Sequence, residues 1–360
     1  MADTVNFEQL LNANYIATAW TEMANANPDD YLGESLFGFK KQTALDLSWL
    51  KGSSGAPIAI APAAYDAEIV LRGRNEAKKI NTEMPLFREG IQLTESDRRA
   101  LQQASALGQA AVDEIIGKVF DDTANLIKGA KVNPEIMRWQ LLAPTDGKPK
   151  IAIANNDIAY AYDYDPNGTW YANNFIDVSS TPWSAAATAT PITNLIAAKD
   201  KAAEKGVTLE YAVMSQKTFS EFSNSAEVKS AVLAQNATAT VFITPSIVKQ
   251  TVKDITGLTI IIYNGIYKDF AGTAKKFMPD KVVTLIPAGL LGNTVYAVTP
   301  EEFDLRNDPK KNVATVEGGI AISVVPTSEL PRRFATYVSE IVLPSYERMD
   351  EVFELKVDAG

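Results

Sequence analysis

The sequence predicts an α+β protein in which one long helix lies on a β-sheet and a layered α/β unit is inserted into the chain. Apolar residues recur at spacings of three, four or five from Leu101 to Ile127, which is typical of a helix that buries one face. From Pro191 to about Val316 helix and strand patterns alternate, and after Val316 only strand patterns follow. Such an order is expected when an α/β unit interrupts a sheet.

Length and composition exclude several classes of protein. The chain has 360 residues, enough for two domains with their own cores. Its net charge of -10 argues against nucleic acid as a tight ligand, because phosphate binding needs clustered Lys and Arg. It contains no cysteine and no histidine, which excludes disulfides, thiolate metal sites and the commonest general base. The N-terminus lacks a signal-peptide pattern, and the longest apolar run, 258–263, is too short to cross a bilayer.

The first 92 residues contain little that would form a core of their own. Residues 1–42 are polar and Asn-rich with scattered aromatic residues, so we expect an arm that lies on another surface, with a helix over 7–20. In 44–92 the pieces LDLSWL and AEIVLRG read as strands, and a stretch rich in Gly, Pro, Ser and Ala separates them. A long two-stranded excursion is marginal alone in water and needs a partner.

The long helix is predicted to begin at Thr94, a good N-cap with Asp97 three residues later. Gly129 is predicted to end it, and Pro134 to begin a shorter helix. A helix over 94–127 would span roughly 50 Å at 1.5 Å per residue. Because its apolar stripe is Ala-rich and follows no strict heptad, we expect a strut across a sheet and not a coiled-coil strand.

The rest of the chain reads as a hairpin, a link, the inserted unit and three returning strands. Residues 150–177 predict two strands joined by a turn at Asp165–Gly168. The Ser/Thr/Ala/Pro-rich segment 183–189 is the best internal boundary. Strands are expected at 319–325, 334–342 and 351–357, and with the hairpin they would complete one discontinuous sheet.

No motif in the chain predicts a catalytic, cofactor or metal site. Asp163, Asp165 and Asn167 match the opening of a calcium loop, but Asn174 stands where a bidentate Glu is required, so a hairpin turn is favoured. Acidic pairs such as Asp121 with Asp122 suggest a solvated helix face more than a glycosidase site, whose two carboxylates must converge. No phosphate loop, nucleophile elbow or dinucleotide fingerprint is present.

The chain resembles the major capsid protein E family of tailed phages, the lambda-type major head proteins of the Hong Kong 97-type capsid fold. The residues that carry the resemblance are GLTIIIYNGIY at 257–267, KKFMPD at 275–280 and KVVTLIP at 281–287, in that order. The closing segments EIVLPS at 340–345 and FELKV at 353–357 are also similar. By layout, the resemblance extends over essentially the whole chain.

The resemblance implies a domain organisation. It divides the chain into an N-terminal arm (1–43), an extended β-hairpin loop over a neighbouring subunit (44–92), a discontinuous peripheral domain with the spine helix (93–182 and 316–360) and an axial α/β domain (183–315).

The resemblance also implies a function. It implies self-assembly into hexamers and pentamers of an icosahedral shell around double-stranded DNA. Portal, scaffolding and decoration proteins would be partners, packaged DNA would be touched only weakly, no membrane or cofactor would be needed, and the virion would be assembled in the host cytoplasm. Intersubunit contacts are expected from the loop and from paired basic residues facing acidic ones, at Trp49, Ile58, Ile60, Tyr65, Arg72, Arg74, Arg332, Arg333 and Glu347. A bacterial compartment shell of the same fold, enclosing a cargo, and an acidic α/β enzyme are the alternatives.

Overall fold

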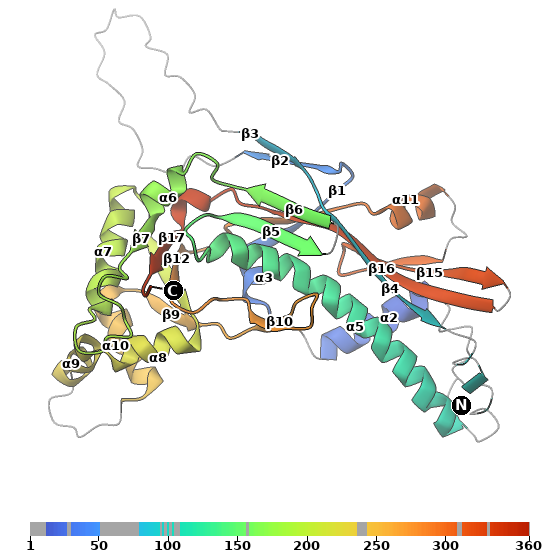
Figure 1. Cartoon of the computed structure of the whole chain (residues 1–360), viewed down its shortest axis with the longest axis horizontal. Coiled ribbons are helices and arrows are strands. Elements are labelled where there is room, and N and C mark those ends of the chain that lie inside the picture. Colours follow the sequence, from blue (N-terminus) through green and yellow to red (C-terminus); the bar gives the residue numbers. More distant parts are fainter. Residues whose placement is uncertain are drawn as a thin grey trace, which may run out of the picture. The chain divides into compact units, whose positions relative to one another are not determined.

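A computed structural model of the chain describes residues 12–26, 30–50, 79–93, 96, 99–100, 103, 109–155, 158–235, 243–307, 312–329 and 332–359. The chain forms two compact units, each made of discontinuous segments (Figure 1). The first unit comprises 1–48, 81–135 and 293–345, and the second comprises 49–80, 136–292 and 346–360. Each unit has its own sheet and its own hydrophobic core.

The first unit is built on a six-stranded sheet. Its strands are β1 (Phe37–Gln42), β4 (Leu86–Leu93), β13 (Gly292–Ala297), β14 (Val313–Val316), β15 (Ile320–Glu329) and β16 (Arg332–Ser345). Their order is β1-β13-β16-β15-β14, and β4 also pairs with β16. β16 has 14 residues, so one part of it pairs with β4 and the other with β13. The strand thereby joins segments from distant parts of the chain in one sheet.

Helix α2 (Ala13–Ala26) packs on this sheet, as does the part of helix α5 (Gln109–Leu142) that belongs to the first unit. From α2 the core receives Ile16 and Trp20, and from α5 it receives Ala124 and Ile127, which pack with apolar residues of β14, β15 and β16. The prediction that the long helix lies on a sheet of returning strands is confirmed for this part of α5. Two shorter helices, α3 (Leu32–Leu36) and α11 (Pro300–Asn307), complete the unit.

The second unit has a five-stranded sheet in the order β7-β17-β12-β8-β9. The strands are β7 (Phe175–Asp177), β8 (Leu209–Met214), β9 (Thr259–Ile262), β12 (Val282–Pro287) and β17 (Phe353–Lys356). The β7–β17 and β8–β9 pairs are parallel, and β12 is antiparallel to both of its neighbours. The sheet is therefore mixed. Because β8 and β9 are parallel, the chain between them must cross from one end of the sheet to the other, and helices within residues 216–256 make this connection.

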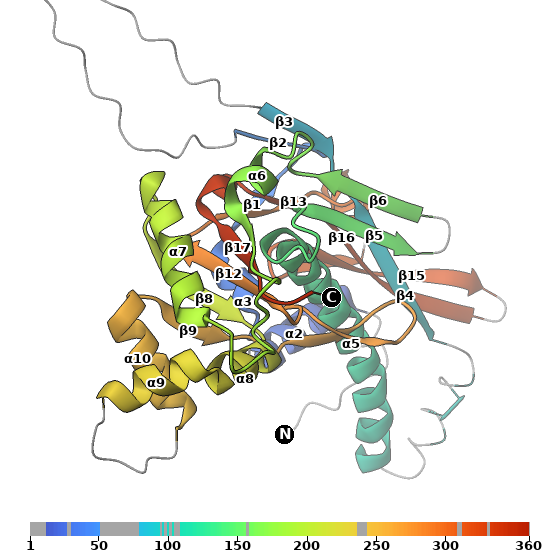
Figure 2. The same cartoon turned by 60° about the vertical axis from the view of Figure 1, so that its left-hand side comes forward.

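Four helices pack on this sheet, as Figure 2 shows. They are α7 (Pro191–Glu204), α8 (Gln216–Asn224), α9 (Ala226–Gln235) and α10 (Pro245–Thr256). Helix α10 follows the local rules closely. The Thr244 side chain accepts a hydrogen bond from the Ile247 amide, Pro245 occupies the first turn, and Gly257 ends the helix with a φ of 75°. These helices confirm the alternating pattern predicted for the inserted unit.

Three two-stranded sheets complete the described chain. They are β2 (Asp46–Leu50) with β3 (Lys79–Glu83), β5 (Lys150–Asn155) with β6 (Ile158–Asp163), and β10 (Ile266–Lys268) with β11 (Ala274–Lys276). The strand predicted at LDLSWL is confirmed by β2. The strand predicted at AEIVLRG lies outside the described residues.

The long helix is continuous from Gln109 to Leu142, so the predicted end at Gly129 and the predicted restart at Pro134 are wrong. A glycine in a helix interior costs only about 1 kcal/mol relative to alanine. The neighbours Ile127 and Ala130 are buried in the first core, and their packing offsets that cost. The predicted start at Thr94 lies outside the described residues.

The predicted single sheet is also wrong. β17 joins the second sheet, and there Phe353 and Leu355 are buried in the core of the second unit. The hairpin at 150–177 forms its own two-stranded sheet, and the segment predicted as its returning strand begins as helix α6 (Thr169–Asn174). Trp170 is buried in α6 and its indole N–H donates to the carbonyl of Met349 at 2.9 Å, a contact that a hairpin strand would not provide.

The two units divide the chain at other points than the expected domains. α11 and nearly all of β13 and β14 fall within the predicted axial segment 183–315 but belong to the first unit. The C-terminal strand β17 falls within the predicted peripheral segment 316–360 but belongs to the second unit. The division into arm, loop, peripheral and axial domains stays a prediction of the resemblance.

Candidate assembly interface

Few of the predicted contact residues can be placed on the surface of the described chain. Trp49 is only 7% exposed, and its ring lies 5.3 Å from the ring of Tyr164, measured between centroids. Arg332 and Arg333 lie in β16, opposite Glu329 and Ser328 of β15. The remaining predicted contacts are Glu347, which is half-buried, and Ile58, Ile60, Tyr65, Arg72 and Arg74, which lie outside the described residues.

The hairpin formed by β10 and β11 presents large apolar side chains to solvent. Ile266 is 69% exposed and Phe270 is 58% exposed, and Ile266 is the most exposed large hydrophobic residue of the described part of the chain. Single exposed apolar residues are ordinary. Two on one short hairpin make a candidate contact, because such groups are stabilised when another surface covers them.

The turn between the two strands is held by the side chain of Asp269. Its Oδ1 accepts hydrogen bonds from the backbone amides of Ala271 at 3.0 Å and Thr273 at 2.8 Å. Its Oδ2 forms an ion pair with Lys275 at 2.9 Å. The hydrogen bond from Lys275, with those from the backbone, lowers the pKa of the Asp269 carboxyl. Gly272, with a φ of 80°, provides the left-handed position that the turn requires.

Stacked aromatic rings fix the base of the hairpin. The ring of Tyr267 lies 4.9 Å from that of Phe277, Phe277 lies 6.1 Å from Tyr263, and Tyr263 stacks on Trp139 of α5 at 4.9 Å. Gly265 is needed beside them, because a Cβ there would lie 2.7 Å from the Tyr263 hydroxyl. Burial raises the pKa of Tyr267. An isolated two-stranded hairpin is marginal in water, and this packing provides the missing support.

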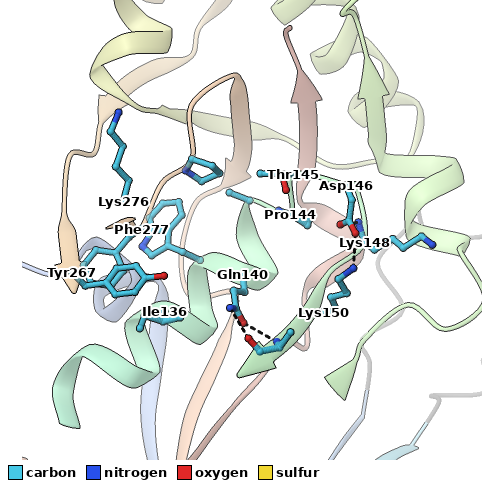
Figure 3. A pocket seen from close by; sticks show the side chains of 14 residues that line it. Ile136, Gln140, Pro144, Thr145, Asp146, Lys148, Lys150, Tyr267, Lys276 and Phe277 are labelled. Carbon is cyan, nitrogen blue, oxygen red and sulfur yellow. Dashed lines mark hydrogen bonds and ion pairs between the residues drawn. The ribbon is translucent and has the colours of Figure 1, made fainter. Parts of the chain in front are cut away.

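A shallow cavity of about 350 Å³ lies beside the hairpin, with Tyr267 and Phe277 next to Ile136 on one side (Figure 3). Gln140 lies in its wall and bonds the backbone of Ala152 twice, at 3.0 and 3.1 Å. The side-chain amide of Gln140 thus satisfies the backbone N–H and C=O of Ala152 in β5. The polar side chain serves the fold and is not offered to a ligand.

Three charged residues of the cavity wall, Asp146, Lys150 and Lys276, form ion pairs. Asp146 forms an ion pair with Lys150 at 2.5 Å, and Lys276 forms one with Asp280 at 2.8 Å. Burial opposes the charged form of Asp146, but the hydrogen bonds from the Lys150 side chain and the Lys148 backbone outweigh it, so the pKa of this carboxyl is lowered. The cavity contains no nucleophile held against a base, which is the arrangement that covalent catalysis needs.

The calcium-like segment forms a turn. The Gly168 amide donates to the carbonyl of Asp165 at 2.9 Å, and the Asp165 carboxylate accepts the amide of Tyr171 at 3.0 Å. Within the described ranges there is no group of three or more acidic residues that could hold a metal ion. The helices that the structure describes include none long and apolar enough to cross a membrane.

Comparison with known proteins identifies the family. The model of the family described as phage major capsid protein E matches residues 12–355. No curated protein matches the chain by sequence. A solved structure described as a prophage capsid protein from E. coli is 14% identical, with a TM-score of 0.59, and the match covers 96% of this chain and 99% of the other.

Two further solved structures are similar. A phage-related protein from Bordetella bronchiseptica is 12% identical, with a TM-score of 0.51 and coverage of 94% and 96% of the two chains. A chain of the capsid of Cyanophage A-1(L) is 11% identical, with a TM-score of 0.50 and coverage of 92% and 95%. These likenesses show the fold, and the family match over nearly the whole chain shows what kind of protein has it. The chain belongs to the phage major capsid protein E family and is a structural capsid protein with the Hong Kong 97-type fold.

Proposed function

We propose that copies of this chain assemble, as hexamers and pentamers, into an icosahedral shell that encloses phage double-stranded DNA. The observation that carries the proposal is the family match over residues 12–355. In the cavity, Gln140 bonds the backbone of Ala152, and Asp146 and Lys276 form ion pairs with Lys150 and Asp280.

The charge of the chain supports the proposed content of the shell. Many copies of a subunit with a net charge of -10 would not bind DNA tightly, because tight binding needs clustered cations. A wall of this kind would let DNA enter and leave. Portal, scaffolding and decoration proteins are proposed as further partners, and assembly is proposed to take place in the host cytoplasm.

Electron microscopy and sedimentation of the expressed chain test self-assembly. We expect closed shells that sediment far ahead of the 39.1 kDa subunit. A preparation that contains only a discrete monomer under all conditions of salt and concentration would contradict the proposal. Dissociation of the shells in denaturant, followed by return to native buffer, provides the control that the particles are built by this chain alone.

The content of the shell is tested on particles purified from the cells in which the chain is naturally made. We expect DNA that resists nuclease in intact particles and is digested after the particles are disrupted. Particles that hold a protein cargo and no protected DNA would instead indicate a bacterial compartment of the same fold. Measuring both contents on one preparation separates these two functions.

A further inference from the structure

The hairpin β10–β11 has features of a binding element that no contact among the described residues explains. Ile266 and Phe270 are exposed, yet the turn between the strands is fixed by Asp269 and the base is fixed by the aromatic rings around Phe277. A tip that needed only to be soluble would gain nothing from exposed apolar side chains. A tip that binds gains from rigidity, since ordered residues lose little conformational entropy on association.

The charge of the hairpin is opposite to that of the chain. Residues 266–276 contain three lysines and one aspartate, a net charge of +2, in a chain whose net charge is -10. Asp269 already pairs with Lys275, and Lys276 pairs with Asp280 outside the hairpin. Lys268 is exposed on the first strand. Opposite charges steer association and select the partner, so the hairpin suits an acidic surface.

We propose that the tip of β10–β11 is a contact through which the chain binds the acidic surface of a second copy of itself, with Ile266 and Phe270 covered by that copy and Lys268 facing its carboxylates. The inference rests on the proposed function, because a shell brings acidic copies of this chain together. The tip extends the predicted set of intersubunit contacts to residues 266–270 of the second unit.

The first test compares the double variant I266S/F270S with the single variant F303S. Phe303 of α11 is the same residue type as Phe270 and is equally exposed, at 58%, so F303S removes a comparable apolar group elsewhere. We expect I266S/F270S to fold with an unchanged circular dichroism spectrum, since neither side chain is in a core. Its critical concentration for assembly should rise at least tenfold, which corresponds to about 1.4 kcal/mol, whereas that of F303S should stay within about twofold of the wild type.

The outcomes separate this inference from the proposed function. If the wild type and I266S/F270S assemble at the same concentration, the hairpin contact is refuted and the shell function stands. Equal losses in I266S/F270S and F303S would also refute it, because the effect would then belong to any exposed apolar group. If no form of the chain assembles, including the wild type, the proposed function itself fails.

A second measurement uses the absence of cysteine from the chain. The variant F270C carries a single thiol at the tip, and its rate of reaction with a maleimide reports whether the tip is covered. We expect labelling at least tenfold slower in assembled particles than in dissociated subunits, with the unfolded chain as the reference for a fully exposed thiol. Equal rates in particles and subunits would overturn the proposal.

Discussion

The buried carboxyl of Glu354 should make the subunit less stable as the pH rises. Glu354 lies in β17 and is 0% exposed, and neither of its oxygens has a hydrogen-bond partner in the described structure. Burial raises the pKa of this carboxyl well above its ordinary value of 4.5, and the negative charge of Asp146 raises it further. The folded subunit therefore keeps a proton that the unfolded chain releases.

The direction and size of the effect follow from proton linkage. Below pH 4.5 both the folded and the unfolded chain hold the proton, so Glu354 adds no dependence on pH. Above it the unfolded chain ionises first. The free energy of unfolding then falls by about 1.4 kcal/mol for each pH unit until the pH reaches the folded pKa. This dependence belongs to Glu354 and adds to that of every other titrating group.

The variant E354Q isolates the effect, because glutamine has nearly the same shape and stays uncharged. Urea unfolding of the wild type and of E354Q at half-unit steps above pH 4.5 gives two stability curves. We expect the wild type to lose about 1.4 kcal/mol per pH unit relative to E354Q. The variant E204Q makes the same chemical change on an exposed helix residue and is the matched control. Parallel curves for the wild type and E354Q would refute the reasoning.

Three further variants test the packing of the long helix. In G33A the new Cβ would lie 2.5 Å from Oε2 of Glu135, and Oε1 of the same carboxylate accepts the Gly33 amide at 2.9 Å. We therefore expect the free energy of unfolding, measured in urea, to fall by about 1–3 kcal/mol. In G129A the new Cβ meets no atom within 4 Å, so the free energy of unfolding should rise by about 0.5–1 kcal/mol. Equal losses of stability in G33A and G129A would contradict this difference. W139A removes the ring stacked on Tyr263 and should cost about 3–5 kcal/mol, and a thermal unfolding midpoint equal to that of the wild type would show that the stack does not support the fold.

Where a structural rule acts within a few residues, the sequence predicts the element well. Helix α10 begins at Thr244 and Pro245 and ends at Gly257, and these residue types are typical of a helix start and a helix end. The side chain of Thr244 reaches an amide three residues away, and the left-handed φ of Gly257 is a property of one residue. The alternation of the returning strands likewise predicted β15 and β16, because side chains of a strand point to opposite faces in turn.

Where an element depends on residues that are distant in the chain, only the tertiary structure shows how it is capped or which sheet it joins. Pro191 marks the start of α7, but the cap there comes from Glu227, whose carboxylate accepts the amides of Ile192 at 2.7 Å and Thr193 at 3.2 Å. No local pattern shows a cap supplied by another helix. β17 has the alternation of a strand, but its choice of sheet depends on whether Phe353 finds a core in the first or the second unit.

The candidate interface shows the same division. The resemblance carried by residues 257–287 and by the order of the elements predicted a structural protein of the capsid fold, and the family match confirms it. Trp49, a predicted contact, is instead buried against Tyr164, and Phe270, which was not singled out, is exposed. Exposure depends on which segments meet in three dimensions, and Trp49 and Tyr164 are more than one hundred residues apart in sequence. The sequence by itself therefore determined the family and those elements whose signals are local, and the tertiary structure decided the others and which side chains remain exposed.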